Sequence, residues 1–283
     1  MIEIGQYHSL VVQRLDDSGA WLDGDELGEI LLPKRHLPDD LAPGESVRVF
    51  LYLDTAGHTV ATTQHPKALP GQFAYLQAVD NTHVGTFLDW GLDKDLLVPF
   101  AEQHRPMSVD KHYLVYLYLD KLDGRIVASS RIERFLDDNR PHQYRVGQAV
   151  DLIIANSTDL GYKAIINHGH WGVLYENEVF ERLSFGQSIR GYIKRVRTDG
   201  KIDLTLQGGQ ETRDRYAETI LAQLRQSDGF LAVHDKSPPE LISKLFGMSK
   251  KAYKKAIGGL YRQRLIRIED DGIYLNDDSA NGD

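Results

Sequence analysis

The chain has 283 residues, no cysteine and a formal net charge of −8 at neutral pH. Without cysteine it forms neither a disulfide framework nor a thiolate zinc site, which favours a reducing compartment. No apolar stretch approaches the ~18 residues of a membrane-spanning helix, and the first residues lack a basic region followed by an apolar core. We therefore expect a soluble, cytoplasmic protein with more than one domain.

Three segments of the chain follow the same pattern. Gly-Gln pairs at residues 5–6, 71–72 and 147–148 each precede alternating apolar residues, a glycine-centred turn, an apolar run and a further alternating pair. The tetrapeptide Leu-Tyr-Leu-Asp occurs twice, at residues 51–54 and 117–120. A period of roughly 65–75 residues is longer than that of solenoid repeats and indicates tandem small domains.

Alternating apolar residues between turn signals predict about five strands in each repeat. The predicted strands are residues 10–12, 19–22, 29–33 and 47–53, then 73–79, 85–88, 95–99, 113–119 and 125–129, then 150–155, 163–167, 172–175, 189–196 and 201–206. Five short strands in about 65 residues are too few for a two-sheet sandwich but suffice for a small closed barrel of the OB type. The predicted barrel domains are residues 1–66, 67–138 and 139–210.

One strand leaves two interpretations open. Within residues 47–53, the valines and leucines at odd positions share one face of the strand, so Phe50 and Tyr52 point to the other face. These two rings either face a ligand or pack against a neighbouring barrel.

The turns resemble those of a known RNA-binding barrel. Gly-Ala-Trp-Leu at residues 19–22 and Gly-Thr-Phe-Leu at 85–88 are similar to the Gly-Ala-Phe-Val turn of the barrels repeated in ribosomal protein S-one. Residues 120–126 resemble that family's Asp-x-x-Gly-Arg-Ile signature, and residues 197–201 do so more loosely. The first repeat has His58 where a cation is expected, so it is the weakest candidate for RNA contact.

Exposed aromatic rings and cations are what a single-stranded nucleic acid requires, because a ring stacks on a base for ~1–3 kcal/mol while the cations hold phosphate. The candidate stacking residues are Trp21, Phe87, Trp90, Tyr162 and Trp171. The further RNA-binding candidates are Asp120, Arg125, His168, Arg190, Tyr192, Lys194, Arg195, Arg197 and Lys201. The alternative for each ring is that it fills a barrel interior. His168 and His170 have no third ligand at a recognisable spacing, so neither a metal nor another cofactor is expected.

After residue 210 the apolar residues follow helical spacing. We expect one helix to stop at residues 227–229, a second to be capped and opened by Ser237-Pro238-Pro239 and to end at Gly247, and a third to start at Ser249. Residues 266–268 and 273–275, separated by an acidic turn, predict a hairpin. The sequence therefore predicts a winged helix-turn-helix over residues 211–283, and a mostly β protein with a small α+β C-terminal domain.

The third of these helices is apolar on one side and basic on the other. Its candidate nucleic-acid contacts are Lys250, Lys251, Lys254, Lys255 and Arg262. Charge along the chain supports this assignment, because residues 1–64 contain 4 Lys and Arg against 11 Asp and Glu, whereas residues 190–267 contain 17 against 8. The alternative is a solvated lysine-rich surface.

Several segments resemble the conserved virulence factor B family. They are residues 234–240, 246–251 and 260–261 in the tail, and residues 161–163 and 175–180 in the third repeat. Together with three barrels in the same order, this resemblance covers nearly the whole chain. It implies a bacterial RNA-binding regulatory protein with three S-one-type barrels and a winged helix.

No Gly-x-Ser-x-Gly elbow, phosphate loop or His-Glu-x-x-His motif is present, so we predict a non-enzymatic protein. It binds single-stranded RNA through the barrels, while the winged helix makes a second contact with nucleic acid or the ribosome; no membrane or small-molecule substrate is expected. One alternative is a DNA-binding transcription factor whose barrels bind proteins. The other is a magnesium-dependent nuclease that uses Asp93 with Asp95, or Asp137 with Asp138.

Overall fold

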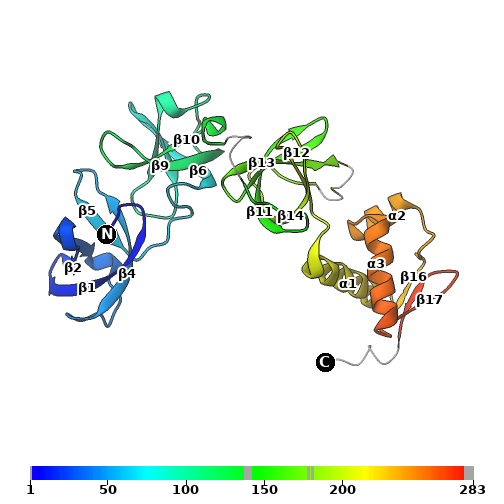
Figure 1. The fold of residues 1–283 in the computed structure, drawn as a ribbon. Coiled ribbons are helices and arrows are strands. Elements are labelled where there is room, and N and C mark those ends of the chain that lie inside the picture. The colour runs from blue at the N-terminus through cyan, green and yellow to red at the C-terminus, as the bar shows by residue number, and fades with distance from the viewer. Residues whose placement is uncertain (1, 137–141, 177–178, 180–181, 277–283) are drawn as a thin grey trace. The chain divides into compact units, whose positions relative to one another are not determined.

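The structure is a computed structural model that describes residues 2–136, 142–176, 179 and 182–276. Three closed five-stranded β-barrels precede a small domain of helices and short strands (Figure 1). The predicted fold class is confirmed. Met1–Leu136 and Asp137–Asp283 are two compact units. No helix in the described part of the chain is long and apolar enough to cross a membrane.

The three barrels have the same topology. Their strands are β1 (Tyr7–Asp16), β2 (Gly19–Asp23), β3 (Glu29–Pro33), β4 (Ser46–Leu53) and β5 (Thr59–Thr62); β6 (Phe73–Asn81), β7 (Gly85–Asp89), β8 (Leu96–Pro99), β9 (His112–Leu119) and β10 (Ile126–Ser129); and β11 (Ala149–Thr158), β12 (Gly161–Ile166), β13 (His170–Tyr175), β14 (Ser188–Val196) and β15 (Ile202–Thr205). In each barrel the first three strands form an antiparallel meander, and the third strand pairs in parallel with the fifth. The fourth strand pairs with the first and closes the barrel.

A glycine opens the second strand of every barrel because no other residue fits there. Gly19, Gly85 and Gly161 have φ between +134° and +154°. A Cβ at any of them would lie 2.1–2.3 Å from a carbonyl oxygen of the third strand. The glycine of the S-one-type turn is therefore a steric requirement of this barrel.

The first barrel's interior contains Val47, Val49 and Leu51, as the alternation of β4 predicts. Phe50 and Tyr52, on the other face of β4, are buried in a cluster with residues of the second barrel. Of the two interpretations of these rings, packing against a neighbouring barrel is confirmed.

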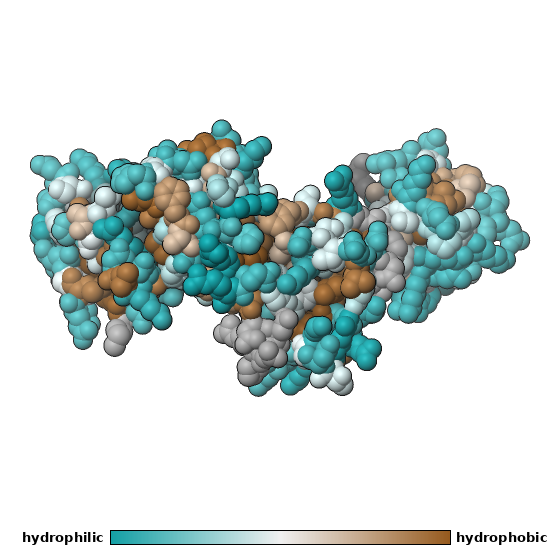
Figure 2. Space-filling view, turned by 90° about the horizontal axis from the view of Figure 1, so that it is seen from above, coloured by the Kyte–Doolittle hydropathy of each residue, from teal (hydrophilic) through white to brown (hydrophobic). Residues whose placement is uncertain are grey.

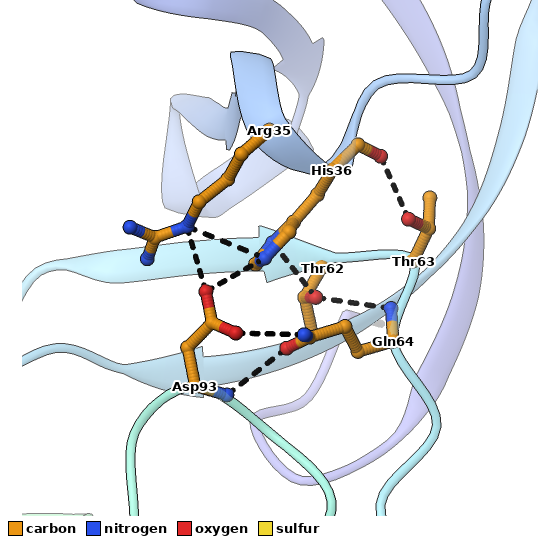
Figure 3. Close-up of polar contacts among 6 residues, drawn as sticks. All are labelled: Arg35, His36, Thr62, Thr63, Gln64 and Asp93. Carbon is orange, nitrogen blue, oxygen red and sulfur yellow. Dashed lines mark hydrogen bonds and ion pairs between the residues drawn. The ribbon is translucent and has the colours of Figure 1, made fainter.

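Polar contacts join the same two barrels (Figure 3). His36, which is only 7% exposed, donates from Nε2 to Asp93 Oδ2 at 3.0 Å, and its Nδ1 contacts Thr62 Oγ1 at 2.9 Å. Arg35 Nε lies 2.7 Å from the same Asp93 oxygen, and Gln64 Nε2 donates to Oδ1 at 2.7 Å. The Asp93 carboxylate of the second barrel is thus held by three side chains that belong to the first barrel or follow its last strand immediately.

The Phe50 position carries an aromatic ring in all three barrels. In each barrel, the residue after this ring accepts a backbone hydrogen bond from the glycine of the preceding Gly-Gln pair; these residues are 51, 117 and 193. Phe50, Tyr116 and Tyr192 are therefore equivalent. Tyr116 stacks on Phe135 with centroids 4.1 Å apart. Tyr192 lies against Gly208, where a Cβ would approach the ring within 2.4 Å. In each barrel, a segment that follows the barrel in the sequence packs against this ring.

The C-terminal domain is the predicted winged helix. Its elements are α1 (Gly209–Gln226), β16 (Phe230–Leu231), α2 (Pro239–Phe246), α3 (Lys250–Arg262), β17 (Ile266–Ile268) and β18 (Ile273–Leu275). Gly247 ends α2 at φ +60°, and the Ser249 side chain caps α3 by accepting from Ala252 N. Ser237 was expected to cap α2, but Pro238 holds that position and Ser237 Oγ instead accepts from His234 N.

Hydrophilic residues predominate on the face drawn in Figure 2, where the apolar residues form separate patches. Clusters of buried hydrophobic residues lie within the first barrel, within the third barrel, across the first two barrels and in the winged helix, where Tyr253 is fully buried.

Candidate nucleic-acid interface

Each barrel has an equivalent row of three residues on the outer face of its second, third and fifth strands, which we call the outer row. The strand register defines the rows as Trp21, Leu31 and Val60; Phe87, Leu97 and Val127; and Lys163, Val173 and Asp203. Paired residues point to the same side of a sheet, so each row is a continuous strip. The strip is apolar in the first two barrels and polar in the third.

The first barrel covers its own aromatic residue. The Arg14 guanidinium lies 4.5 Å from the centroid of the half-buried Trp21 ring. Arg14 is held by Asp16 at 2.7 Å and by Glu29 at 3.1 Å. The indole Nε1 of Trp21 donates to Asp16 at 2.6 Å, and this bond lowers the pKa of Asp16. A base would have to displace the guanidinium from the ring and approach two carboxylates.

In the second barrel, Phe87 is half-buried in the outer row. Arg125 lies two residues before Val127 and so faces the same side of the barrel, although its Nη2 also donates to the Thr55 carbonyl at 2.8 Å. Asp120 Oδ1 accepts from Leu122 N at 2.8 Å, so this carboxylate orders the turn before β10.

Two carboxylates lie on the same face of the second barrel as Phe87. Asp89, two residues after Phe87 on β7, forms an ion pair with Lys67 at 2.6 Å. Asp95 lies two residues before Leu97, and burial, followed by the nearby charges of Asp89 and Asp80, raises its pKa.

Three of the predicted RNA-binding rings are placed elsewhere. Trp90 is 2% exposed, lies between the first two barrels and donates from Nε1 to Lys94 O at 2.6 Å. Tyr162 packs against the interior cluster of the third barrel, because it follows Gly161 at an inward-facing position. Tyr192 is 5% exposed beneath Gly208. Trp90 and Tyr192 are therefore covered by protein, in line with the alternative that a ring fills an interior.

The third barrel has a lysine in its outer row where the first two barrels have an aromatic ring. Lys163 occupies the position of Trp21 and Phe87, and its ammonium lies 3.7 Å from the centroid of the Trp171 ring, which is 8% exposed. Sequence reasoning missed this lysine as a binding candidate, although its place after the turn glycine could have identified it.

The predicted cations of the third barrel differ in their surroundings. Arg197 is paired with Asp203 at 2.7 Å and donates to Tyr175 Oη. The other predicted cations are exposed. They are Arg190, with Asp151 at 2.7 Å; Lys201, with Asp199 at 3.9 Å; Lys194; and Arg195. Burial lowers the pKa of His168, and the nearby charge of Asp151 partly opposes this shift.

The basic side of α3 is solvent-facing. Lys251, Lys254, Lys255 and Arg262 are exposed, and Lys250 is half-buried with Nζ donating to the Lys236 carbonyl at 3.2 Å. Lys254 lies 3.7 Å from Asp235.

The hairpin beside α3 has the opposite charge, since the turn between β17 and β18 contains exposed Glu269, Asp270 and Asp271. The turn of this hairpin is therefore acidic, whereas the exposed side of α3 is lysine-rich.

Among the residues that the structure describes, no three His, Asp or Glu side chains form a group that could hold a metal ion. His170 is buried and its Nδ1 lies 3.2 Å from Tyr144 Oη. Asp93 of the nuclease alternative is bound by His36 and Gln64, and Asp137 and Asp138 lie outside the described residues.

Comparisons with known proteins agree with this architecture. Residues 4–64 match the family model described as S1 domain, and residues 218–275 match the CvfB-like winged helix domain. Conserved virulence factor B of Staphylococcus aureus is 28% identical over 292 residues, covering 96% of this chain and 94% of that protein. YitL of Bacillus subtilis is 28% identical over 288 residues, with 95% and 93% covered.

Among solved structures, a multidomain protein with nucleic acid binding domains from Streptococcus pneumoniae is 24% identical, with a TM-score of 0.42. The match covers 96% of this chain and 98% of that one.

Proposed function

We propose that this chain, which is similar to conserved virulence factor B over nearly its whole length, is a non-enzymatic, RNA-binding regulator of bacterial gene expression. It acts during or after transcription, binding single-stranded RNA through its barrels and making a second contact with nucleic acid or the ribosome through its winged helix. Neither matching family model describes a catalytic domain.

The outer row of the second barrel is the observation that carries the proposal. Phe87 is a half-buried ring next to Leu97, and no interaction within the described residues covers it as Arg14 covers Trp21. Arg125 faces the same side. A ring of this kind stacks on a base for ~1–3 kcal/mol, and a neighbouring guanidinium attracts the phosphate.

The barrels divide this task unequally in our proposal. The second barrel stacks bases on Phe87, whereas the third holds phosphate with the exposed Lys194, Arg195 and Lys201. The first barrel, in which Arg14 covers the Trp21 ring, contributes less to RNA binding than the second. The domains that carry these roles are residues 1–66, 67–138 and 139–210, followed by 211–283.

The exposed lysines of α3 also favour a second candidate, a DNA-binding transcription factor. A winged helix bound to duplex DNA places a helix in the major groove and its hairpin near the backbone. The carboxylates at residues 269–271 would meet phosphate there with like charge, which weighs against this candidate.

Binding of the full-length protein to labelled single-stranded RNA, single-stranded DNA and duplex DNA, measured by fluorescence anisotropy over a series of salt concentrations, tests the proposal. We expect the tightest binding to single-stranded RNA, with affinity falling as salt rises. Tighter binding to duplex DNA would favour the transcription factor.

A further inference from the structure

A pocket of about 390 Å³ lies in the second barrel. Its walls come from the last residue of β6, from β7 and from the segment that follows β8. Its lining includes Asn81, Thr86, Phe100, Gln103, His104 and Arg105, and we call it the Gln103 pocket. This volume is within the ~300–1,000 Å³ typical of small-molecule sites.

The orientation of the Gln103 amide is fixed. Gln103 is 7% exposed, and its Nε2 donates to the Val98 carbonyl and to Thr86 Oγ1, both at 3.1 Å. A carbonyl oxygen only accepts, so the amide nitrogen must face Val98. The amide oxygen, Oε1, is consequently directed away from both partners.

The neighbouring bonds confirm this direction. The Thr86 hydroxyl donates to Asn81 Oδ1 at 2.6 Å, and Asn81 Nδ2 donates to the Met107 carbonyl at 3.2 Å. The bonds therefore run one way, from Gln103 through Thr86 and Asn81 to Met107.

No described residue donates to Gln103 Oε1. Every buried side-chain oxygen or nitrogen in the described residues has a hydrogen-bond partner, so an oxygen without one is not buried. Oε1 is therefore accessible from outside as an acceptor.

The opening of the Gln103 pocket carries a ring, an imidazole and a guanidinium. Phe100, immediately after β8, is 57% exposed. His104 and Arg105 are exposed on the same segment. An open ring, a fixed acceptor and a guanidinium match the three parts of a nucleotide that a protein recognises: the face of the base, an N–H on its edge, and the phosphate.

We propose that the Gln103 pocket holds one unpaired nucleobase of bound RNA. The base lies beside Phe100, an N–H of its edge donates to Gln103 Oε1, and Arg105 attracts the adjacent phosphate. The Gln103 Oε1 acceptor favours adenine and cytosine, because their exocyclic amines can donate to it. Uracil is disfavoured, because its single N–H lies between two carbonyl oxygens that would face the Gln103 carbonyl. This site rests on the proposed RNA-binding function and adds a base preference to it.

Anisotropy titrations of the full-length protein with short oligomers of adenosine, cytidine or uridine test the pocket. Phe100→Ala should weaken binding to the adenosine oligomer about tenfold, as expected for a lost stacking contact. Tyr75→Ala removes a ring of the same barrel that is 37% exposed and does not line the pocket, so its binding should stay within about twofold of wild type. Gln103→Met should reduce the preference for adenosine and cytidine over uridine.

The outcomes separate this inference from the function on which it rests. Wild-type affinity in Phe100→Ala, together with weak binding in Phe87→Ala, would overturn the pocket and leave RNA binding standing. A wild-type preference for the uridine oligomer would also overturn it. Absence of single-stranded RNA binding by the wild-type protein would remove the proposed function itself. Circular dichroism of each variant confirms that it is folded.

Discussion

The ring of Phe50 lies edge-on to the indole of Trp90, with centroids 5.9 Å apart and ring planes at 78°. Phe50 belongs to the first barrel and Trp90 to the second, and both are almost completely buried. Edge-to-face pairs of this kind contribute ~0.5–1.5 kcal/mol beyond their buried area. Phe50, which alternation alone leaves ambiguous, and Trp90 are therefore part of the core that joins the two barrels.

Trp90→Ala should destabilise the Met1–Leu136 unit by about 3–5 kcal/mol, because it leaves a cavity against Phe50. Urea denaturation of the full-length protein measures this loss. Trp21→Ala should cost less, since that ring is half-buried at the surface. A Trp90→Ala protein of wild-type stability that no longer binds RNA would show that Trp90 contacts RNA after all.

Phe87→Ala should weaken binding to single-stranded RNA by about 1–3 kcal/mol, the value of one stacked base. Trp21→Ala should have a smaller effect, because Arg14 already occupies the ring face. Anisotropy titrations at one salt concentration compare the two variants. Equal losses would mean that RNA displaces Arg14 and that the first barrel also binds.

Lys251→Glu combined with Lys255→Glu should reduce the salt dependence of nucleic-acid binding, with the slope falling by about one for each lost phosphate contact. Lys254 is less suitable because Asp235 lies 3.7 Å away. Lys244→Glu, on α2, changes the same kind of charge outside α3 and is the matched control. A slope unchanged in the double variant would assign the α3 lysines to solvent.

The contact between the first two barrels should weaken at acidic pH. The hydrogen bond from Gln64, followed by that from His36 and the charge of Arg35, lowers the pKa of Asp93. The unfolded chain takes up a proton near its reference pKa of ~3.9, so this stabilisation is present above that pH and is lost as pH falls through the lower folded value.

Asp93→Asn should accordingly be less stable than wild type at neutral pH, and the difference in melting temperature should shrink below about pH 4. Thermal denaturation over a pH series measures it. A difference that stays constant to the lowest pH would mean that the charge of Asp93 does not stabilise the contact.

The local features of the fold were predictable from sequence. β3 and the hairpin strands β17 and β18 have the predicted boundaries, because short apolar runs between turn residues determine them. The two-residue strand β16 was missed, since two residues carry no periodic signal.

Long-range features of the site were not predictable. A register shift between Val12 and Arg14 places Arg14 opposite Trp21, and simple alternation along β1 does not indicate that irregularity. The Gln103 pocket depends on bonds from Gln103 to Thr86 and onward to Asn81, which the topology of the barrel brings together. Side chains that meet only after the barrel closes leave no pattern in a single sequence.

Photo-crosslinking of single-stranded RNA to the full-length protein, followed by mass spectrometry of the linked peptides, tests the central claim most directly. We predict the strongest crosslinks in peptides that contain Phe87 and Phe100, with further crosslinks in the third barrel. Crosslinks confined to the first barrel or to α3 would contradict the assignment of the second barrel as the base-stacking surface.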